Sequence, residues 1–141
     1  MKSAKWMLPV TLVLLSGLMA AQSLRNSRVV AQVPFDFMVN NKIIPAGECD
    51  VGSLGMLGNT LMIRNFDART GALAVSSKDQ ATQTAASSVL VFKHYGNQYF
   101  LSEIRLAGSN QTYKLPASRA EAELRAQNSP VSQQTLRASL K

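Results

Sequence analysis

Apolar and polar residues alternate along several short stretches of the chain, at the period of two that a half-buried β-strand needs. The clearest stretch covers residues 33–39, where Val33, Phe35, Phe37 and Val39 share one face. Shorter stretches follow at 43–44, 49–54, 61–64, 72–76 and 111–115, separated by turn-forming glycine, proline and asparagine. This pattern predicts short antiparallel strands joined by tight turns.

Residues 89–95 and 98–106 flank a Gly96-Asn97 pair, which is typical of the two-residue loop of a β-hairpin. The register of such a hairpin places Tyr95 opposite Gln98, His94 opposite Tyr99, and Phe92 opposite Leu101. Both faces of these strands are partly apolar, which favours a central position in the sheet.

The remaining segments are predicted to be less regular. Residues 77–88 are polar and without periodicity, which favours a long mobile loop. Ser118 and Glu121 have the spacing of a capping box and predict a short helix, with Glu121 and Arg125 placed for an i,i+4 pair. Residues 127–141 are polar and predict a frayed tail.

The amino terminus is typical of a secretory signal peptide. Lys2 and Lys5 precede an uncharged apolar stretch at residues 6–21, which is shorter than the roughly 20 residues of a bilayer-spanning helix. We therefore expect export to the periplasm or the extracellular space, and no membrane span in the mature protein.

The predicted organisation is a signal peptide at 1–21, a linker at 22–32, a β-rich domain at 33–126 and a flexible tail at 127–141. The predicted fold is all-β: a single antiparallel β-sandwich or small barrel of about seven or eight strands, with a short C-terminal helix.

Charge and cysteine content narrow the function classes. The formal net charge is +7, but the basic residues are scattered along the chain, so no nucleic-acid partner is predicted. Cys49 is the only cysteine, which excludes an internal disulfide and favours a buried thiol in an exported protein.

No combination of residues points to catalysis, a cofactor or a metal. His94 is the only histidine, and the chain lacks the Gly-x-Ser-x-Gly and Ser-x-x-Lys motifs of hydrolases. Glu48 and Asp50 are spaced for weak cation binding, although two carboxylates on a solvent-facing strand surface are common. The candidate binding surface is instead the aromatic cluster of the hairpin: Phe92, His94, Tyr95 and Tyr99.

The ordered pieces together resemble a family of small exported proteins associated with acidobacteria, in which VPFDF, LPAGxY, LxIR, LVFxxYGxxYFL and LPxSRxExEL follow one another. The corresponding pieces lie between residues 33 and 125. Cys49 stands where the family pattern has tyrosine, which puts an aromatic core contact at this position in doubt. The resemblance implies export and a β-rich fold, and it implies no reaction.

The leading hypothesis is a non-enzymatic envelope or secreted protein that binds a partner, such as an envelope component or another protein, or contributes to surface structure. A small barrel that binds an apolar ligand in its interior is the first alternative. A hydrolase that uses His94 is the second, and it requires an acid and a hydroxyl within reach of the imidazole.

Overall fold

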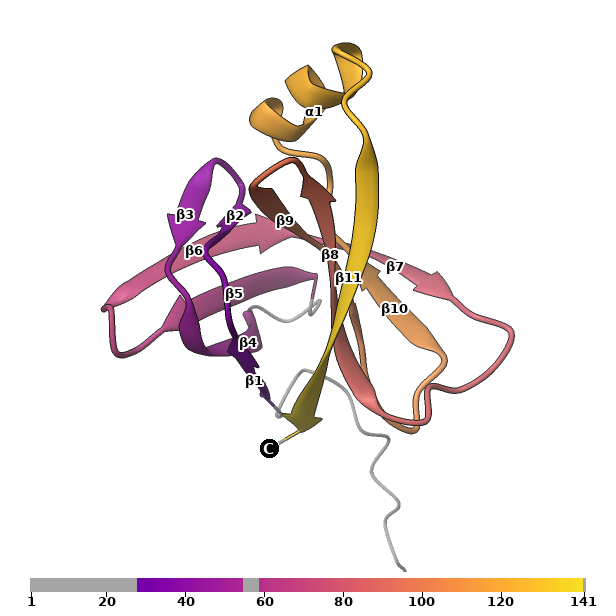
Figure 1. The fold of residues 1–141 in the computed structure, drawn as a ribbon. Helices are drawn as coiled ribbons and strands as arrows, with labels where there is room; N and C mark the ends of the chain where they lie inside the picture. The colour runs from indigo at the N-terminus through magenta and orange to yellow at the C-terminus, as the bar shows by residue number, and fades with distance from the viewer. Residues whose placement is uncertain (1–27, 55–58, 141) are drawn as a thin grey trace, which may run out of the picture.

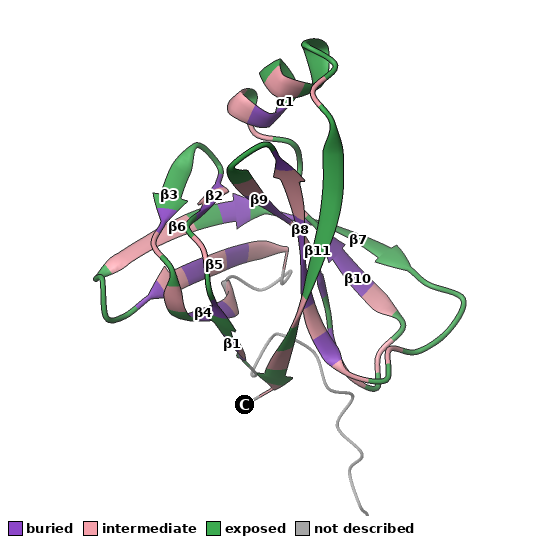
Figure 2. Ribbon diagram, viewed as in Figure 1, coloured by how far each residue is buried: buried purple, intermediate pink, exposed green. Residues whose placement is uncertain are grey.

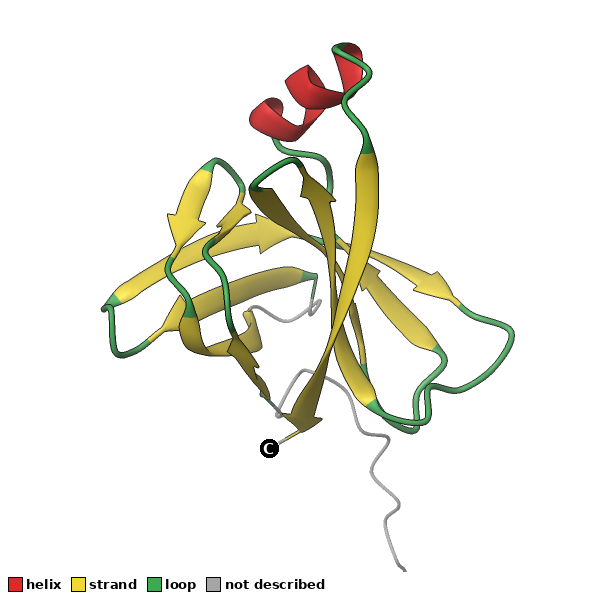
Figure 3. Cartoon of the chain, viewed as in Figure 1, coloured by secondary structure: helices red, strands yellow, loops and turns green. Residues whose placement is uncertain are grey.

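The computed structural model describes residues 28–54 and 59–140; the signal-peptide prediction for 1–21 and most of the predicted linker lie outside them. In chain order the elements are β1 (Val29–Val33), β2 (Phe37–Val39), β3 (Lys42–Ile44), β4 (Gly47–Leu54), β5 (Thr60–Asn65), β6 (Thr70–Val75), β7 (Ser77–Gln80), β8 (Ser88–Tyr95), β9 (Gln98–Arg105), β10 (Gln111–Lys114), α1 (Arg119–Ala126) and β11 (Val131–Leu140). Figure 3 shows the strands and the short helix α1 of the described residues. The predicted all-β class with a short C-terminal helix is confirmed.

The strands form a nearly closed barrel. One continuous path of paired strands runs β9–β8–β11–β1–β4–β5–β6. Ser76 alone separates β6 from β7, and β7 pairs with β10, which pairs back to β9 (Figure 1). The β2–β3 hairpin sits beside β9 through a parallel pair between Met38 and Phe100. It is linked to β6 by Asn40, whose Nδ2 donates to the carbonyl of Leu73 at 3.2 Å.

The strand number differs from the prediction: the described residues contain 11 strands, not seven or eight. The predicted strand at 33–39 is divided because Pro34 has no amide hydrogen to continue a ladder, so β1 ends at Val33 and β2 starts at Phe37. Residues 29–32, predicted as linker, belong to strand β1, and residues 77–80, predicted as part of a loop, form strand β7.

The largest correction concerns the C-terminal residues predicted to fray. Val131–Leu140 form β11, which pairs antiparallel with β8 from Val131↔Tyr95 to Ala138↔Ser88 and with β1 at Val29↔Leu140. The first five residues of β11 are exposed, as the green part of this strand in Figure 2 shows. Backbone pairing therefore holds the first half of this strand in the sheet, while Leu136, Ala138 and Leu140 in its second half also pack against the core.

The barrel interior is filled by side chains. Apolar residues of at least six strands meet there, including Val29, Val33, Val51, Leu61, Ile63, Leu90 and Ile104. Phe37, Phe92 and Tyr113 are the bulkiest members of this core, and each is no more than 1% exposed. Small barrels whose interior is packed in this way leave little room for a ligand at their centre.

The predicted hairpin and helix are both present. β8 and β9 pair with Tyr95↔Gln98, His94↔Tyr99 and Phe92↔Leu101, as the sequence predicts. The Ser118 Oγ accepts the backbone N–H of Glu121 at 3.2 Å, which is the capping interaction expected for α1.

Candidate functional site

The aromatic cluster of the β8–β9 hairpin does not form one exposed surface. Phe92 points into the barrel, where its ring meets Phe35 and Phe37 edge-on at centroid distances of 5.0 and 5.1 Å. Tyr95 packs edge-on against Phe100 at 5.7 Å and is 3% exposed. Burial of Phe92 and Tyr95 removes both from contact with a ligand, and only His94 and Tyr99 stay partly exposed.

His94 is part of a stack of three rings. Its ring lies parallel to Tyr99 with centroids 4.0 Å apart, and Tyr99 lies parallel to Phe35 at 3.7 Å. Among the described residues, no carboxylate or hydroxyl side chain forms a hydrogen bond with either imidazole nitrogen. The arrangement is typical of aromatic packing, and it does not provide the acid–histidine–nucleophile relay of a hydrolase.

Tyr95 instead helps to hold α1 on the barrel. Its hydroxyl donates to the Glu121 Oε1 at 3.2 Å and accepts from the Arg125 Nε at 3.2 Å. Arg125 Nη2 also donates to the Glu121 Oε1 at 3.3 Å. The Lys93 Nζ lies 3.9 Å from the same carboxylate oxygen. The hydrogen bond that Arg125 donates to Tyr95 and the nearby Glu121 carboxylate raise the pKa of Arg125. The i,i+4 spacing predicts the Glu121–Arg125 pair, but neither the burial of Glu121 nor the contact of both residues with Tyr95.

The carboxylate pair Glu48 and Asp50 does not have the geometry of a cation site. Asp50 is 5% exposed and forms ion pairs with Arg28 at 3.1 Å and with Arg64 at 3.5 Å. Its negative charge is thus already compensated by two guanidinium groups. No group of three or more potential metal ligands occurs within residues 28–54 and 59–140.

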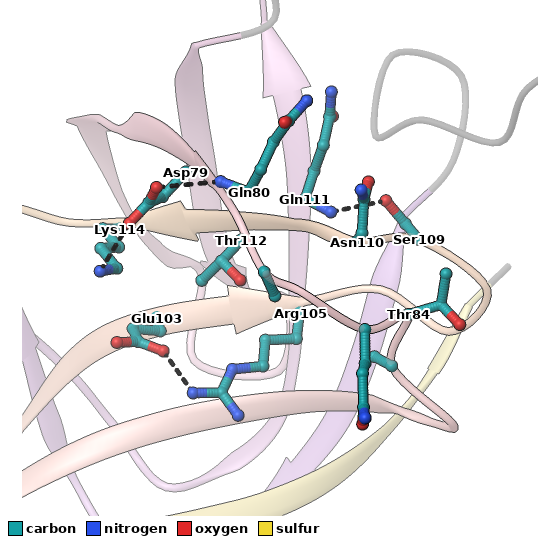
Figure 4. A pocket seen from close by; sticks show the side chains of 13 residues that line it. Asp79, Gln80, Thr84, Glu103, Arg105, Ser109, Asn110, Gln111, Thr112 and Lys114 are labelled. Atoms are coloured by element: carbon teal, nitrogen blue, oxygen red, sulfur yellow. Dashed lines mark hydrogen bonds and ion pairs between the residues drawn. The ribbon is translucent and has the colours of Figure 1, made fainter.

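The structure shows a different candidate site, a polar pocket of about 410 Å³ on the outer side of β7, β10 and β9. Figure 4 shows the pocket between these strands and the segment around Thr84. Seven of its 13 lining residues carry an amide or a hydroxyl group: Gln80, Gln83, Thr84, Ser109, Asn110, Gln111 and Thr112. This volume lies within the range of small-molecule sites in proteins.

Backbone hydrogen bonds fix the wall of the pocket formed by residues 81–85. The N–H of Ala81 donates to the carbonyl of Asn110 at 2.7 Å, and the N–H of Ala85 donates to the carbonyl of Ser109 at 3.0 Å. The N–H of Gly108 in turn donates to the carbonyl of Ala85 at 2.9 Å. These bonds connect the segment to the β9–β10 turn and thereby place Thr84 at the edge of the pocket.

The four charged groups of the pocket are paired with one another. Lys114 Nζ lies 3.0 Å from Asp79, and Arg105 Nη2 lies 2.8 Å from Glu103. The hydrogen bond to Lys114 lowers the pKa of Asp79, and the same contact raises the pKa of Lys114. Both charge signs are thus balanced inside the pocket, and amides and hydroxyls remain to contact a ligand (Figure 4).

The sequence contained a partial signal for this site. Residues 77–88 are rich in serine, threonine and glutamine, and this composition predicts a long mobile loop. The same polar residues line a pocket because β7 pairs with β10 and places them at the sheet surface.

Comparison with known proteins does not assign a family to this chain. No family model matches the chain, and no curated protein or solved structure is significantly similar to it. The resemblance to exported acidobacterial proteins therefore stays a prediction.

Proposed function

We propose that this chain is an exported, non-enzymatic binding module whose polar pocket takes an uncharged, hydroxyl-rich ligand such as a saccharide. The observation that carries the proposal is the lining of the pocket, where amides and hydroxyls surround two internally paired charge couples. A charged ligand would have to separate Asp79 from Lys114 or Glu103 from Arg105. A neutral ligand forms hydrogen bonds without that cost.

Export is supported by the amino-terminal sequence, in which Lys2 and Lys5 precede an uncharged stretch of 16 residues. In the described part of the chain, no helix has the length and apolar character needed to cross a membrane. An envelope or extracellular setting is also where a binding module would meet saccharides.

The two alternative functions have less support. A barrel that holds an apolar ligand needs space in its interior, but Phe37, Phe92 and Tyr113 occupy the interior here. A hydrolase that uses His94 needs an acid and a hydroxyl bonded to the imidazole. Among the described residues the contact recorded for the His94 ring is its stack on Tyr99.

The proposal is tested by calorimetric titration of the protein with neutral trisaccharides of glucose and of N-acetylglucosamine. We expect saturable binding to at least one of them, and about tenfold weaker binding for a Gln80→Ala, Gln111→Ala double variant. This loss corresponds to about 1.4 kcal/mol, the scale of one or two hydrogen bonds.

Gln133→Ala is the matched control, because Gln133 is an exposed glutamine on β11 and does not line the pocket. No saturable binding at millimolar concentrations would contradict the proposal. Equal weakening by the control and by the pocket variant would place the binding elsewhere.

A further inference from the structure

Two of the exposed apolar side chains share one groove of the barrel surface. The described residues include five large hydrophobic side chains that are clearly exposed, namely Ile43, Phe66, Leu73, Val75 and Val131. All except Val131 belong to β3, β6 or the turn between β5 and β6. Single exposed apolar residues are ordinary, and Ile43 and Val75 line other hollows of the surface. Exposed apolar residues that share a groove, as Phe66 and Leu73 do, indicate a binding surface.

Phe66 and Leu73 belong to a groove of about 430 Å³ over the β5–β6 hairpin. The turn of this hairpin projects at the left of Figure 1, away from α1 and from the polar pocket. The groove is lined by Met62, Arg64, Asn65, Phe66, Arg69, Thr70, Gly71, Ala72 and Leu73. Its surface is thus mainly apolar, in contrast to the polar pocket on β7, β10 and β9.

Gly71 shapes the groove by having no side chain. A Cβ atom at this position would lie 3.0 Å from the Arg64 Cγ and 3.2 Å from the carbonyl oxygen of Ile63. Glycine therefore allows the Arg64 stem to lie close against β6. The Arg64 guanidinium then lies 4.6 Å from the centre of the Phe66 ring, a cation–π contact at the groove.

The charge of the groove is positive. Its lining contains Arg64 and Arg69 and no acidic residue. Arg64 shares the buried carboxylate of Asp50 with Arg28, so one negative charge serves two guanidinium groups. Arg69 is exposed, and no carboxylate in the described part of the chain forms an ion pair with it.

Buried hydrogen bonds hold the hairpin turn in place. Asn65 is 1% exposed, and its Nδ2 donates to the carbonyls of Pro45 at 3.0 Å and Ala46 at 3.2 Å. Its Oδ1 accepts the N–H of Ala68 at 3.1 Å. The turn that carries Phe66 and Arg69 is thus hydrogen-bonded through Asn65 to the β3–β4 connection. The groove is therefore preorganised for binding.

We propose that the groove binds a small amphiphile with an aliphatic chain and an acidic head group, of the kind represented by a fatty acid. The chain packs against Met62, Phe66 and Leu73, and the head group lies between the guanidinium groups of Arg69 and Arg64. Charge complementarity selects the acidic head, and the apolar area of the groove selects the aliphatic chain.

The test is a calorimetric titration of the full chain with sodium decanoate below its micelle-forming concentration, repeated with decyltrimethylammonium. We expect saturable binding of decanoate and at least tenfold weaker binding of the cationic amphiphile. Leu73→Gln should weaken decanoate binding about tenfold, and Arg69→Gln should remove the preference for the anionic head. Arg69 and Leu73 are both exposed, so folding of these variants, checked by circular dichroism, should be unchanged.

Val131→Gln and Arg137→Gln are the matched controls, since both residues are exposed on β11 and outside the groove. They should bind decanoate as the unchanged protein does. Absence of saturable binding, equal binding of both amphiphiles, or equal losses in groove and control variants would overturn the proposal. Trisaccharide binding uses other residues, so its failure leaves this test unaffected.

Discussion

Cys49 provides a quantitative test of the barrel interior. Its side chain is 0% exposed and belongs to the core. Cys49 lies on β4, where its backbone is opposite Ala31 of β1 and Asn65 of β5. Burial raises the pKa of the thiol from 9.0 to about 11, and the nearby carboxylates of Asp50 and Glu48 add to the effect. The thiolate is the form that reacts with disulfide reagents.

The expected loss of reactivity follows from these pKa values. At pH 8 a thiol with a pKa of 9.0 is about 10% ionised, whereas one with a pKa of about 11 is about 0.1% ionised. Ionisation alone therefore slows labelling about 100-fold, and the buried position of the sulfur slows it further. Labelling by an aromatic disulfide reagent at pH 8 should accelerate by at least this factor when urea unfolds the protein.

The same pKa difference makes stability depend on alkaline pH. The folded state favours the protonated thiol, so this contribution is complete below pH 9 and is lost as the pH rises to about 11. Between pH 8 and pH 10.5 the free energy of unfolding should fall by about 2 kcal/mol more than in Cys49→Ala, which lacks the titrating group. Urea denaturation of both proteins measures this difference.

Two results would refute the reasoning. Labelling of the native protein at the rate of the unfolded chain would show that the sulfur is accessible. The same pH dependence in the unchanged protein and in Cys49→Ala would show that the folded state does not favour the protonated thiol.

Two further predictions concern the carboxyl-terminal third of the chain. Glu121→Ala should lower the free energy of unfolding in urea by about 2 kcal/mol, because it leaves the buried Tyr95 hydroxyl without its acceptor and removes one of the two acceptors of Arg125. The exposed Glu123→Ala should change it by less than about 0.5 kcal/mol. A chain that ends at Pro130 should lose its cooperative thermal transition in circular dichroism, because β8 and β1 lose their shared partner strand. A cooperative transition near that of the full chain would contradict this second expectation.

The elements that the sequence predicted well carry a local chemical signal. The Gly96-Asn97 turn and the alternation around it were sufficient to predict the register of β8 and β9. The capping box at Ser118 was sufficient to predict the start of α1. In both cases neighbouring residues determine the structure, and no distant contact has to be known.

The missed strands differ in why they were missed. In β1, Val29, Ala31 and Val33 do alternate and are buried, so a signal existed but was overlooked beside the predicted signal peptide. In β11, Leu136, Ala138 and Leu140 alternate and pack against the core, but the exposed residues 131–135 show no such alternation and are held by backbone pairing with β8. The polar pocket was missed because it depends on β7 pairing with β10, a contact between distant segments.

The order in which strands are synthesised has a consequence for how this protein can fold. β1 pairs on one edge with β4 and on the other with β11, the last strand of the described residues. A chain that emerges amino terminus first therefore keeps one edge of β1 open until β11 has been made. Such non-local pairing slows folding. It also means that the barrel cannot close around its core while only the first ten strands exist.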